Sequence, residues 1–338
     1  MSLILTCNAG STNSKLAAFD KDTMRRHSHI VAHNMAEAIE WMRSIGNLRV
    51  SAISHRVVHG GKQFTQPTII NQDVLKKLHD LVPLAPLHQP AALKLIEQTQ
   101  MLYPDIPQIA CFDTAFHHTQ MELEKRLPLP ERYYQQGIQR YGFHGLSYQH
   151  IANVLPEYAG NNARGKIVAA HLGGGSSACA MSELKSVATT MGFSTLEGLM
   201  MSTRCGSLDP GAILYLWNEL HMKPDQIQHV LYMESGLYGV SGISGDMRSL
   251  MESESEKAKN AIDLYCHLAA KQIAGLLPAL QGLDALVFTG GIGENAPLIR
   301  ERIVSALRWV GDFQTYVIPA DEERVLADTA LNHVTRIR

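Results

Sequence analysis

The fold is decided by KIVAAHLGGGSSACAM, residues 166–181, which repeats the layout of SLILTCNAGSTNSKLAAFD, residues 2–20. Each stretch is typical of an apolar strand, a turn rich in glycine or serine, and a second strand. The turns NAGSTNS (8–14) and HLGGGSS (171–177) take the same place in the two halves. This repetition predicts an α/β protein of two lobes, each with one turn of a kind that can bind phosphate.

Helix and strand patterns alternate after both turns. In the first half the predicted elements are a helix at 35–45, a strand at 50–61, helices at 72–81 and 90–103, and a strand at 107–116. In the second half they are helices at 210–220, 225–233 and 254–280, a strand at 285–295, a helix at 299–311, a strand at 315–319 and a closing helix from Asp321. No low-complexity linker separates the halves, so we expect a packed hinge near residues 113–120.

The composition is that of an ordinary globular protein with 338 residues, 45% of them hydrophobic, and a formal net charge of -2. No basic tract stands out, which argues against nucleic acid or an anionic membrane as a partner. The apolar run at the N-terminus is too short for a signal peptide or a membrane span. Five cysteines without CxxC spacing indicate free thiols in a reducing cytoplasm: Cys7, Cys111, Cys179, Cys205 and Cys266.

The glycine-rich turns are the first candidates for ligand binding. Glycines in HLGGGSS let backbone N–H groups approach phosphate oxygens, and Ser176 and Ser177 add hydroxyl donors. The turn is neither a Walker A loop nor a GxGxxG motif opening a helix, which disfavours a dinucleotide-binding domain. A third turn, TGGIGEN (289–295), follows an apolar strand, where α/β proteins bind nucleotides. Any one of these turns could be an ordinary connection, but together they favour a phosphotransferase with a nucleotide cleft between its lobes.

Four polar residues are candidates for catalysis. Arg56 lies inside an apolar strand and must find an anionic partner there. Arg204 lies in a Gly- and Ser-rich loop, where a guanidinium can bind carboxylate or phosphate, although an ordinary surface arginine is the alternative. His144 stands between Phe143 and a glycine, and Asp113 ends a strand, a frequent position of catalytic side chains. The histidines share no metal-ligand spacing, so a zinc site is not expected.

Several motifs together resemble the acetate kinase family, the acetokinases, which includes acetate, propionate and butyrate kinases. They occur in the family's order: NAGSTNSKL, HRVVHGG, LAPLHQPAAL, CFDTAFHHT, RYGFHGLS, HLGGGSS, MGFSTLEGLMMSTRCGSLDPG, SGISGDMR, FTGGIGEN and IPADEE. The resemblance implies two ribonuclease-H-like lobes of the actin and sugar-kinase type, Mg²⁺ with ATP, and a homodimer. It implies an N-terminal lobe at 1–113, completed by the helix at 323–338, and a nucleotide-binding lobe at 114–322.

The resemblance also implies a role for individual residues. Asn8 and Glu322 resemble the magnesium ligands, Arg56 the arginine that binds the substrate carboxylate, and Asp113 a proton donor or acceptor. His144 and Arg204 resemble the stabilisers of the transition state. The acyl pocket is expected at Val58, Leu87, Phe143 and Thr195. The ATP contacts are expected at Lys15, His171, Leu172, Gly173, Gly174, Gly175, Asp246, Met247, Arg248, Gly291, Ile292, Gly293, Glu294 and Asn295.

The implied reaction is reversible phosphorylation of a short carboxylate to an acyl phosphate. A carboxylate with a pKa near 4 is already ionised at pH 7, so the nucleophile needs no general base. The reaction instead needs two anions held in line, with positive charge around the transferring phosphoryl group. We therefore expect Asp113 to position an arginine or a magnesium-bound water rather than to move a proton.

The chain departs from the family pattern at Asn13, Tyr148, Gly174 and Thr195, and it is shorter after Asp20. Thr195 brings a hydroxyl to the expected acyl pocket, so a propionate or butyrate kinase is an alternative to an acetate kinase. The departures also leave open a drifted nucleotide-binding module with little kinase activity. A sugar kinase is disfavoured, because HRVVHGG and GFHG do not suit a polar sugar site.

Overall fold

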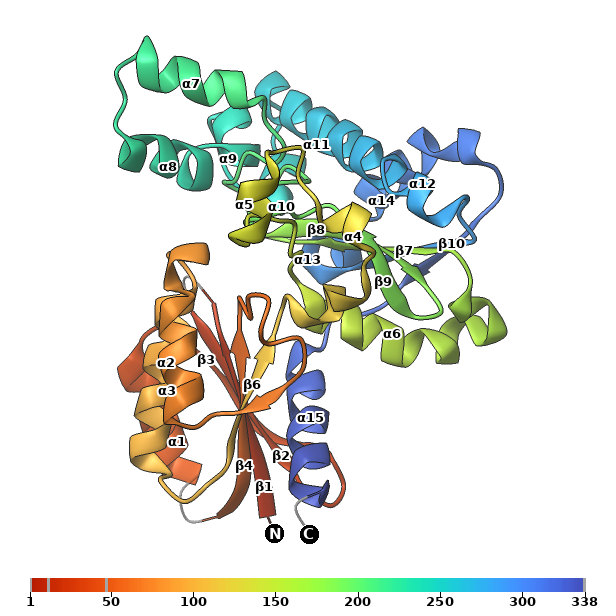
Figure 1. Ribbon diagram of the computed structural model, residues 1–338. Helices are drawn as coiled ribbons and strands as arrows, with labels where there is room; N and C mark the ends of the chain where they lie inside the picture. The colour runs from red at the N-terminus through yellow and green to blue at the C-terminus, as the bar shows by residue number, and fades with distance from the viewer. Residues whose placement is uncertain (1, 11–12, 46–47, 337–338) are drawn as a thin grey trace. The chain divides into compact units, whose positions relative to one another are not determined.

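The computed structural model describes residues 2–10, 13–45 and 48–336, without the side chain of Arg336 (Figure 1). Ser11 and Thr12 of the first predicted turn therefore lie outside the described residues. By its contacts the chain divides into two compact units. Unit 1 comprises residues 1–118, 143–150 and 321–338, and unit 2 comprises residues 119–142 and 151–320.

Unit 1 is built on a six-stranded sheet in the order β3-β2-β1-β4-β6-β5. β1, β2 and β3 form an antiparallel meander, β4 and β6 continue the sheet parallel to β1, and β5 pairs antiparallel with β6. The strands are β1 (Ser2–Ala9), β2 (Ser14–Asp20), β3 (Arg26–Ala32), β4 (Arg49–Val57), β5 (Thr68–Ile69) and β6 (Gln108–Phe112). β3 and β5 were not among the predicted strands. β3 begins with polar residues, and β5 has only two residues, so neither shows an apolar run of strand length.

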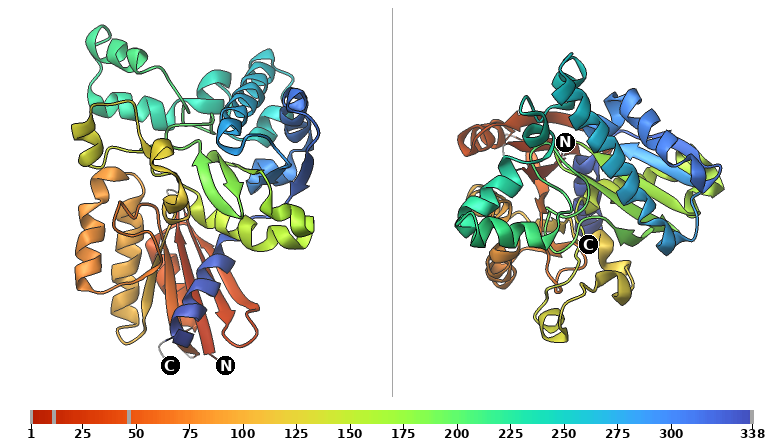
Figure 2. Two further views of the ribbon diagram at one scale, coloured as in Figure 1. Left: turned by 45° about the vertical axis from the view of Figure 1, so that its right-hand side comes forward. Right: turned by 90° about the horizontal axis from the view of Figure 1, so that it is seen from above.

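Helices cover both faces of this sheet. On one face lie α1 (Met35–Ile45), α2 (Gln72–Asp80) and α3 (Gln89–Leu102), with the short η1 (Val82–Leu84) between the last two. On the other face lies α15 (Glu322–Arg336), the blue helix that runs along the strands in the left view of Figure 2. It buries Val325, Leu326 and Ala330 in the core on this side of the sheet. The C-terminal helix thus returns to the sheet formed by the first residues of the chain.

Unit 2 repeats the strand order of unit 1. Its five-stranded sheet has the order β11-β10-β7-β8-β9, with an antiparallel meander β7-β8-β9 and parallel β10 and β11. The strands are β7 (Ile167–Leu172), β8 (Ser176–Ser182), β9 (Lys185–Thr189), β10 (Ala285–Thr289) and β11 (Gln314–Val317). The predicted duplicated α/β fold is confirmed, since β1 and β7 hold equivalent positions.

The core of unit 2 lies between this sheet and a group of helices, of which α11 is the longest (Figure 1). The single helix predicted at 254–280 is broken at Gly275 into α11 (Glu256–Ala274) and α12 (Leu277–Leu280), since Pro278 cannot donate a backbone hydrogen bond. The other helices assigned to unit 2 are α4 (Glu122–Lys125), α5 (Glu131–Gln135), η3 (Gly160–Arg164), α7 (Pro210–Asn218), α8 (Pro224–Met233), α9 (Gly236–Ser241), α10 (Met247–Met251), α13 (Gly290–Asn295), α14 (Pro297–Ala306) and η4 (Arg308–Val310).

Two helical segments contain residues of both units, η2 (Ala115–Thr119) and α6 (Gly145–Ala159). The first residues of α6 belong to unit 1 because the Gly145 N–H donates to the Asp113 carbonyl and Leu146 packs in the core beneath α15. The lobe boundaries expected from the sequence differ from this division in detail and remain a prediction.

Among the described residues, none of the helices is both long and apolar enough to cross a bilayer.

Candidate active site

Three parallel strands of unit 1 end side by side with polar side chains. Along β1, β4 and β6, the residues Ile4, Ala52 and Cys111 contact the core beneath α15. Side chains alternate between the faces of a sheet, so Asn8, Arg56 and Asp113 lie on that same face, at or just after the strand ends. The spacing along each strand therefore brings together three residues that are far apart in the chain.

Arg56 joins the other two residues. Its Nε donates to both Asp113 carboxylate oxygens at 3.1 and 3.0 Å, and its Nη2 donates to Oδ2 at 2.6 Å. Its Nη1 donates to the Asn8 side-chain oxygen at 3.1 Å. The Asp113 side chain is 2% exposed and that of Arg56 is 17% exposed, so the carboxylate is buried and the arginine remains partly accessible. The expected anionic partner of Arg56 is thus Asp113.

Two carboxylates from the start of α15 complete this group, which we call the charged cluster: Asn8, Arg56, Asp113, Glu322 and Glu323. The Asn8 side-chain nitrogen donates to Glu322 at 2.9 Å and to Glu323 at 3.1 Å. Glu323 was not predicted, although it directly follows Glu322 in the motif ADEE.

The charges of the cluster do not cancel. Burial lowers the pKa of Arg56, but Asp113, Glu322 and Glu323 outweigh this and raise it above its ordinary value. Burial raises the pKa of the Asp113 carboxyl, and the Arg56 guanidinium opposes that rise. Three carboxylates face one guanidinium, which leaves an excess of negative charge.

The donor atoms suit a hard divalent cation. Glu322 and Glu323 offer carboxylate oxygens, the ligands preferred by Mg²⁺, and the excess negative charge favours a cation, while the Asn8 amide oxygen is bound to Arg56. Within residues 2–10, 13–45 and 48–336, no group of three or more His, Cys, Asp or Glu side chains is arranged to hold a metal by itself. Any cation here would therefore need oxygens from water or from a phosphorylated substrate as well.

Lys15, an expected ATP contact, lies beside this cluster. It pairs with Asn8 in the register of β1 and β2, so their side chains share a face of the sheet in unit 1. Its exposed side chain is in a different unit from the glycine-rich residues with which it was grouped.

His144 is joined to the cluster through the backbone. Its φ of +58° lies in the left-handed region, which residues other than glycine rarely adopt. The next residue, Gly145, donates its N–H to the Asp113 carbonyl at 3.0 Å.

Phe143 and Val58 are buried, whereas Leu87 is 42% exposed. Of the expected acyl-pocket residues, these three belong to unit 1 and Thr195 belongs to unit 2.

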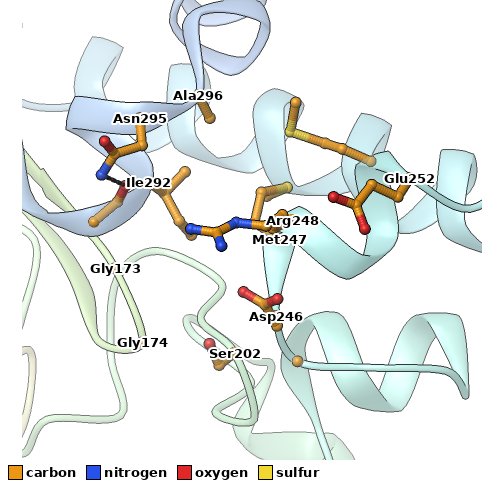
Figure 3. Close-up of a pocket in the computed structure, with 13 residues that line it drawn as sticks. Gly173, Gly174, Ser202, Asp246, Met247, Arg248, Glu252, Ile292, Asn295 and Ala296 are labelled. Atoms are coloured by element: carbon orange, nitrogen blue, oxygen red, sulfur yellow. Dashed lines mark hydrogen bonds between the residues drawn. The ribbon is translucent and has the colours of Figure 1, made fainter.

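In unit 2, glycine-rich turns surround a cavity of about 600 Å³, which we call the glycine cavity (Figure 3). The expected ATP contacts among its lining residues are Gly173, Gly174, Asp246, Met247, Arg248, Gly291, Ile292 and Asn295. In Figure 3 the Arg248 guanidinium extends toward Ile292, while the Asn295 side chain donates to the Gly291 carbonyl at 2.9 Å. Eight of the thirteen lining residues are therefore among the expected ATP contacts, which stay a prediction.

The glycines are needed for different reasons. Gly290 has φ +80°, and a Cβ there would lie 2.8 Å from the Leu172 carbonyl oxygen and 3.2 Å from Nε2 of His171. A Cβ at Gly291 would meet nothing within 4 Å, and at Gly174 only the Ser202 hydroxyl at 3.9 Å. Gly174, one of the departures from the family pattern, therefore enlarges the free space of the cavity rather than relieving a clash.

Some expected contacts do not line the glycine cavity: His171, Leu172, Gly175, Gly293 and Glu294. Glu294 accepts hydrogen bonds from the N–H groups of Gly290 and Ala320, both at 3.0 Å, and so closes the turn. Conversely, the lining includes residues that the sequence did not single out: Ser202, Gly245, Met251, Glu252 and Ala296. Gly245 precedes the motif's Asp246, and Met251 and Glu252 lie one turn beyond Arg248, so helical spacing could have indicated them.

Arg204 and Thr195 meet in unit 2, where Nη1 of Arg204 donates to the Thr195 carbonyl at 3.1 Å. Arg204 is half-buried and the Thr195 side chain is buried. The contact involves the backbone of Thr195, so the Arg204 bond does not depend on which residue stands at position 195.

Comparisons with known proteins agree on one family. The model described as "Acetokinase family" matches residues 6–331. An acetate kinase from Rhodopseudomonas palustris is 44% identical, over 91% of this chain and 87% of that protein. Among solved structures, a propionate kinase from Francisella tularensis has a TM-score of 0.92 at 32% identity, covering 98% of this chain and 100% of that one. The acetate kinase of Porphyromonas gingivalis has a TM-score of 0.88 at 28% identity, covering 98% and 99%.

Proposed function

Because the chain belongs to the acetokinase family, we infer that it transfers a phosphoryl group from ATP to the carboxylate of acetate, giving acetyl phosphate and ADP. The enzyme is a phosphotransferase with a carboxyl group as acceptor. The structural observation that carries the proposal is the Arg56 guanidinium held by Asp113 and Asn8, on a side chain that is 17% exposed. A short carboxylate can accept two parallel hydrogen bonds from such a group.

The glycine cavity is the proposed nucleotide site. Its volume of about 600 Å³ is within the range of small-molecule sites. Gly174 and Gly291 are exposed in the lining, and their backbone N–H groups would receive phosphate oxygens, because no Cβ keeps a ligand away from them. Arg248 supplies positive charge, and Met247, Met251 and Ile292 supply apolar surface for a base.

We propose that Asp113 acts through Arg56. Its carboxylate is bound on one edge of the guanidinium by three N–H···O contacts, so it fixes the direction of the remaining N–H groups. The substrate carboxylate is ionised at neutral pH and requires no base. An aspartate that orients an arginine is therefore a better match to the reaction than one that moves a proton.

Asn8 and Glu322 would hold the divalent cation of the reaction, which we propose to be Mg²⁺, with Glu323 close enough to take part. Such a cation, when bound, neutralises charge on the phosphate oxygens. In this structure the Asn8 amide oxygen accepts from Arg56 and its nitrogen donates to Glu322, so the amide would turn for Asn8 and Glu322 to share a cation.

His144 and Arg204 are proposed to stabilise negative charge on the transferring phosphoryl group. Both are donors of hydrogen bonds: the Arg204 guanidinium is held by the Thr195 carbonyl, and the backbone of His144 is held by the bond from the Tyr148 N–H. Positioned donors of this kind lower the barrier because they need no reorganisation when charge develops.

Acetate is the proposed acid, and propionate is the second candidate because of the similar propionate kinase structure. One methylene changes the binding free energy in an apolar pocket by only about 1–3 kcal/mol. The preferred acid is therefore identified by measured kinetic constants rather than by sequence motifs. The test is kcat/KM for acetate, propionate and butyrate, with acyl phosphate trapped as hydroxamate. The highest value for acetate supports the proposal, and a higher value for propionate or butyrate contradicts the choice of acid.

The same assay separates an enzyme from a drifted nucleotide-binding module. Arg204→Ala is the control, because it removes a proposed stabiliser without touching the glycine cavity. Hydroxamate formed by the wild type and lost in this variant indicates catalysis. If the protein binds ATP but forms no hydroxamate with any of the acids, it is a drifted nucleotide-binding module.

A homodimer and a cytoplasmic location are further proposals. A dimer is supported by α7, none of whose residues is buried and whose Leu214, Tyr215 and Trp217 are each more than half exposed. Light scattering would show a mass of twice 37.3 kDa, and a monomeric mass would contradict it. The reducing cytoplasm is supported by five cysteines that form no disulfide, four buried and Cys205 half-buried.

A further inference from the structure

The turn that carries His144 is strained. A left-handed φ of +58° costs a residue with a Cβ about 1–2 kcal/mol. The position after it admits only glycine, since a Cβ on Gly145 would lie 2.1 Å from the Asp113 carbonyl oxygen. Strained backbone persists only where surrounding contacts hold it.

Three hydrogen bonds fix this turn. The Gly145 N–H donates to the Asp113 carbonyl at 3.0 Å, and the Tyr148 N–H donates to the His144 carbonyl at 3.1 Å within the first turn of α6. The third comes from a side chain, since Nε2 of His117 lies 2.9 Å from the Phe143 carbonyl oxygen. A carbonyl oxygen only accepts, so the proton of His117 is on Nε2.

The environment of His117 keeps its imidazole neutral and in one orientation. The residue is 1% exposed, and burial lowers its pKa to about 4. Its ring meets Phe116 at 5.8 Å and Tyr148 at 5.7 Å, both edge to face. Tyr148, which departs from the family pattern, is fully buried and so forms part of the wall that orients His117.

We propose that His117 is a positioning residue for phosphoryl transfer: its Nε2–H holds the Phe143 carbonyl and so keeps His144 in the left-handed conformation. The proposal rests on the proposed function, in which His144 contacts the transferring phosphoryl group. His117 contacts neither substrate nor the reacting atoms, and it acts through the peptide that precedes His144.

The kinetic test compares three variants of the full chain. His117→Leu removes the donor, His117→Gln keeps an N–H near the position of Nε2, and His118→Leu is the exposed neighbouring control. We expect His117→Leu to lower kcat about 100-fold, the effect of a displacement of about 1 Å at a reacting group, with KM for ATP unchanged. His117→Gln should recover most of the loss, and His118→Leu should match the wild type.

Wild-type kcat in His117→Leu would overturn the proposal, and so would equal losses in folded His117→Leu and His117→Gln. If the leucine variant does not fold, the glutamine variant decides, since it should fold and retain turnover. If KM for ATP rises in the glutamine variant by the same factor as kcat falls, the positioning role is overturned.

A second measurement does not depend on activity. The long-range ¹H–¹⁵N spectrum of the imidazoles at pH 7 should show His117 neutral with its proton on Nε2, and a proton on Nδ1 alone would overturn the proposal. If the wild type forms no acyl phosphate although the Nε2–H signature is present, it is the proposed function that fails. A role of His117 in phosphoryl transfer is then contradicted as well, because the proposal rests on that reaction.

Discussion

The sheets of the two units share five strands in the same order and differ in the residues at the ends of those strands. In unit 1, strands β1, β4 and β6 lead to the side chains of Asn8, Arg56 and Asp113. In unit 2, the equivalent β7 and β10 lead to glycines at 173–175 and 290–291. One scaffold thus supports charged side chains in one unit and open backbone in the other.

The difference reflects the size of the ligand that each unit is proposed to bind. A small carboxylate offers few atoms, so it needs a charge fixed at one point, and Asp113 fixes Arg56. A nucleotide offers many atoms, and a cavity of about 600 Å³ lined by backbone N–H groups can contact several at once. Changes in unit 1 should therefore affect turnover and stability, whereas changes in the glycine cavity should affect nucleotide affinity.

The largest effect is expected from Arg56→Met. It leaves the Asp113 carboxylate, 2% exposed, without its partner, which costs about 3–5 kcal/mol of folding free energy. Turnover should be lost as well. Urea denaturation and the hydroxamate assay measure the two effects.

The double variant Arg56→Met with Asp113→Leu is the matched control for this pair. It removes both charges, so most of the stability should return while turnover stays absent. Turnover restored in the double variant would contradict the role of Arg56 as a contact of the substrate.

Asp113→Asn distinguishes the contribution of unit 1 to turnover from that of unit 2 to ATP binding. The amide fills the same space but loses the charge that orients Arg56, so we expect kcat to fall about 100-fold. The dissociation constant of ATP, measured by calorimetry, should not change because the glycine cavity is in unit 2. Near-normal turnover would remove any catalytic role for Asp113.

Acid should destabilise unit 1 through its buried histidines. Burial lowers the pKa of His55, His59 and His117 from 6.5 to about 4. Between these values the unfolded chain binds protons that the folded chain does not, so stability is complete above pH 6.5 and falls as the pH falls toward 4. Each histidine contributes about 1.4 kcal/mol per pH unit.

His55→Gln tests that slope. Denaturation at several pH values between 6.5 and 4.5 should show the slope reduced by about one proton, or about 1.4 kcal/mol per pH unit. An unchanged slope would mean that His55 is not the group that titrates.

Gly291→Ala should have the smallest effect and the one most specific to unit 2. Its Cβ meets no protein atom within 4 Å, so the fold tolerates it, but the methyl group enters the space offered to the nucleotide. We expect KM for ATP to rise about 10-fold, or about 1.4 kcal/mol, with Tm unchanged. Gly275→Ala, away from the cavity, is the control, and equal KM values in the two variants would argue against a backbone site for phosphate.

The sequence predicted the duplicated fold because strand, turn and strand leave a local pattern. It also predicted that Arg56 needs an anion, since an arginine between Ile53 and Val57 is costly when unpaired. The family resemblance supplied most of the residues that line the glycine cavity.

Other features depend on tertiary structure and leave no local signal. Glu322 and Glu323 meet Asn8 only because α15 returns to the sheet, more than 300 residues later. The positive φ of His144 contradicts the usual preference of its residue type, and the bond from His117 to Phe143 spans 26 residues. Ser202 joins the cavity through a loop whose course the sequence pattern does not specify.

The most direct test of phosphoryl transfer to acetate is ³¹P NMR of the protein with ATP, Mg²⁺ and acetate. We predict that the acetyl phosphate signal grows in step with ADP, and that Arg56→Met abolishes both. ATP that stays intact, or that yields ADP and inorganic phosphate without acetyl phosphate, would contradict this function.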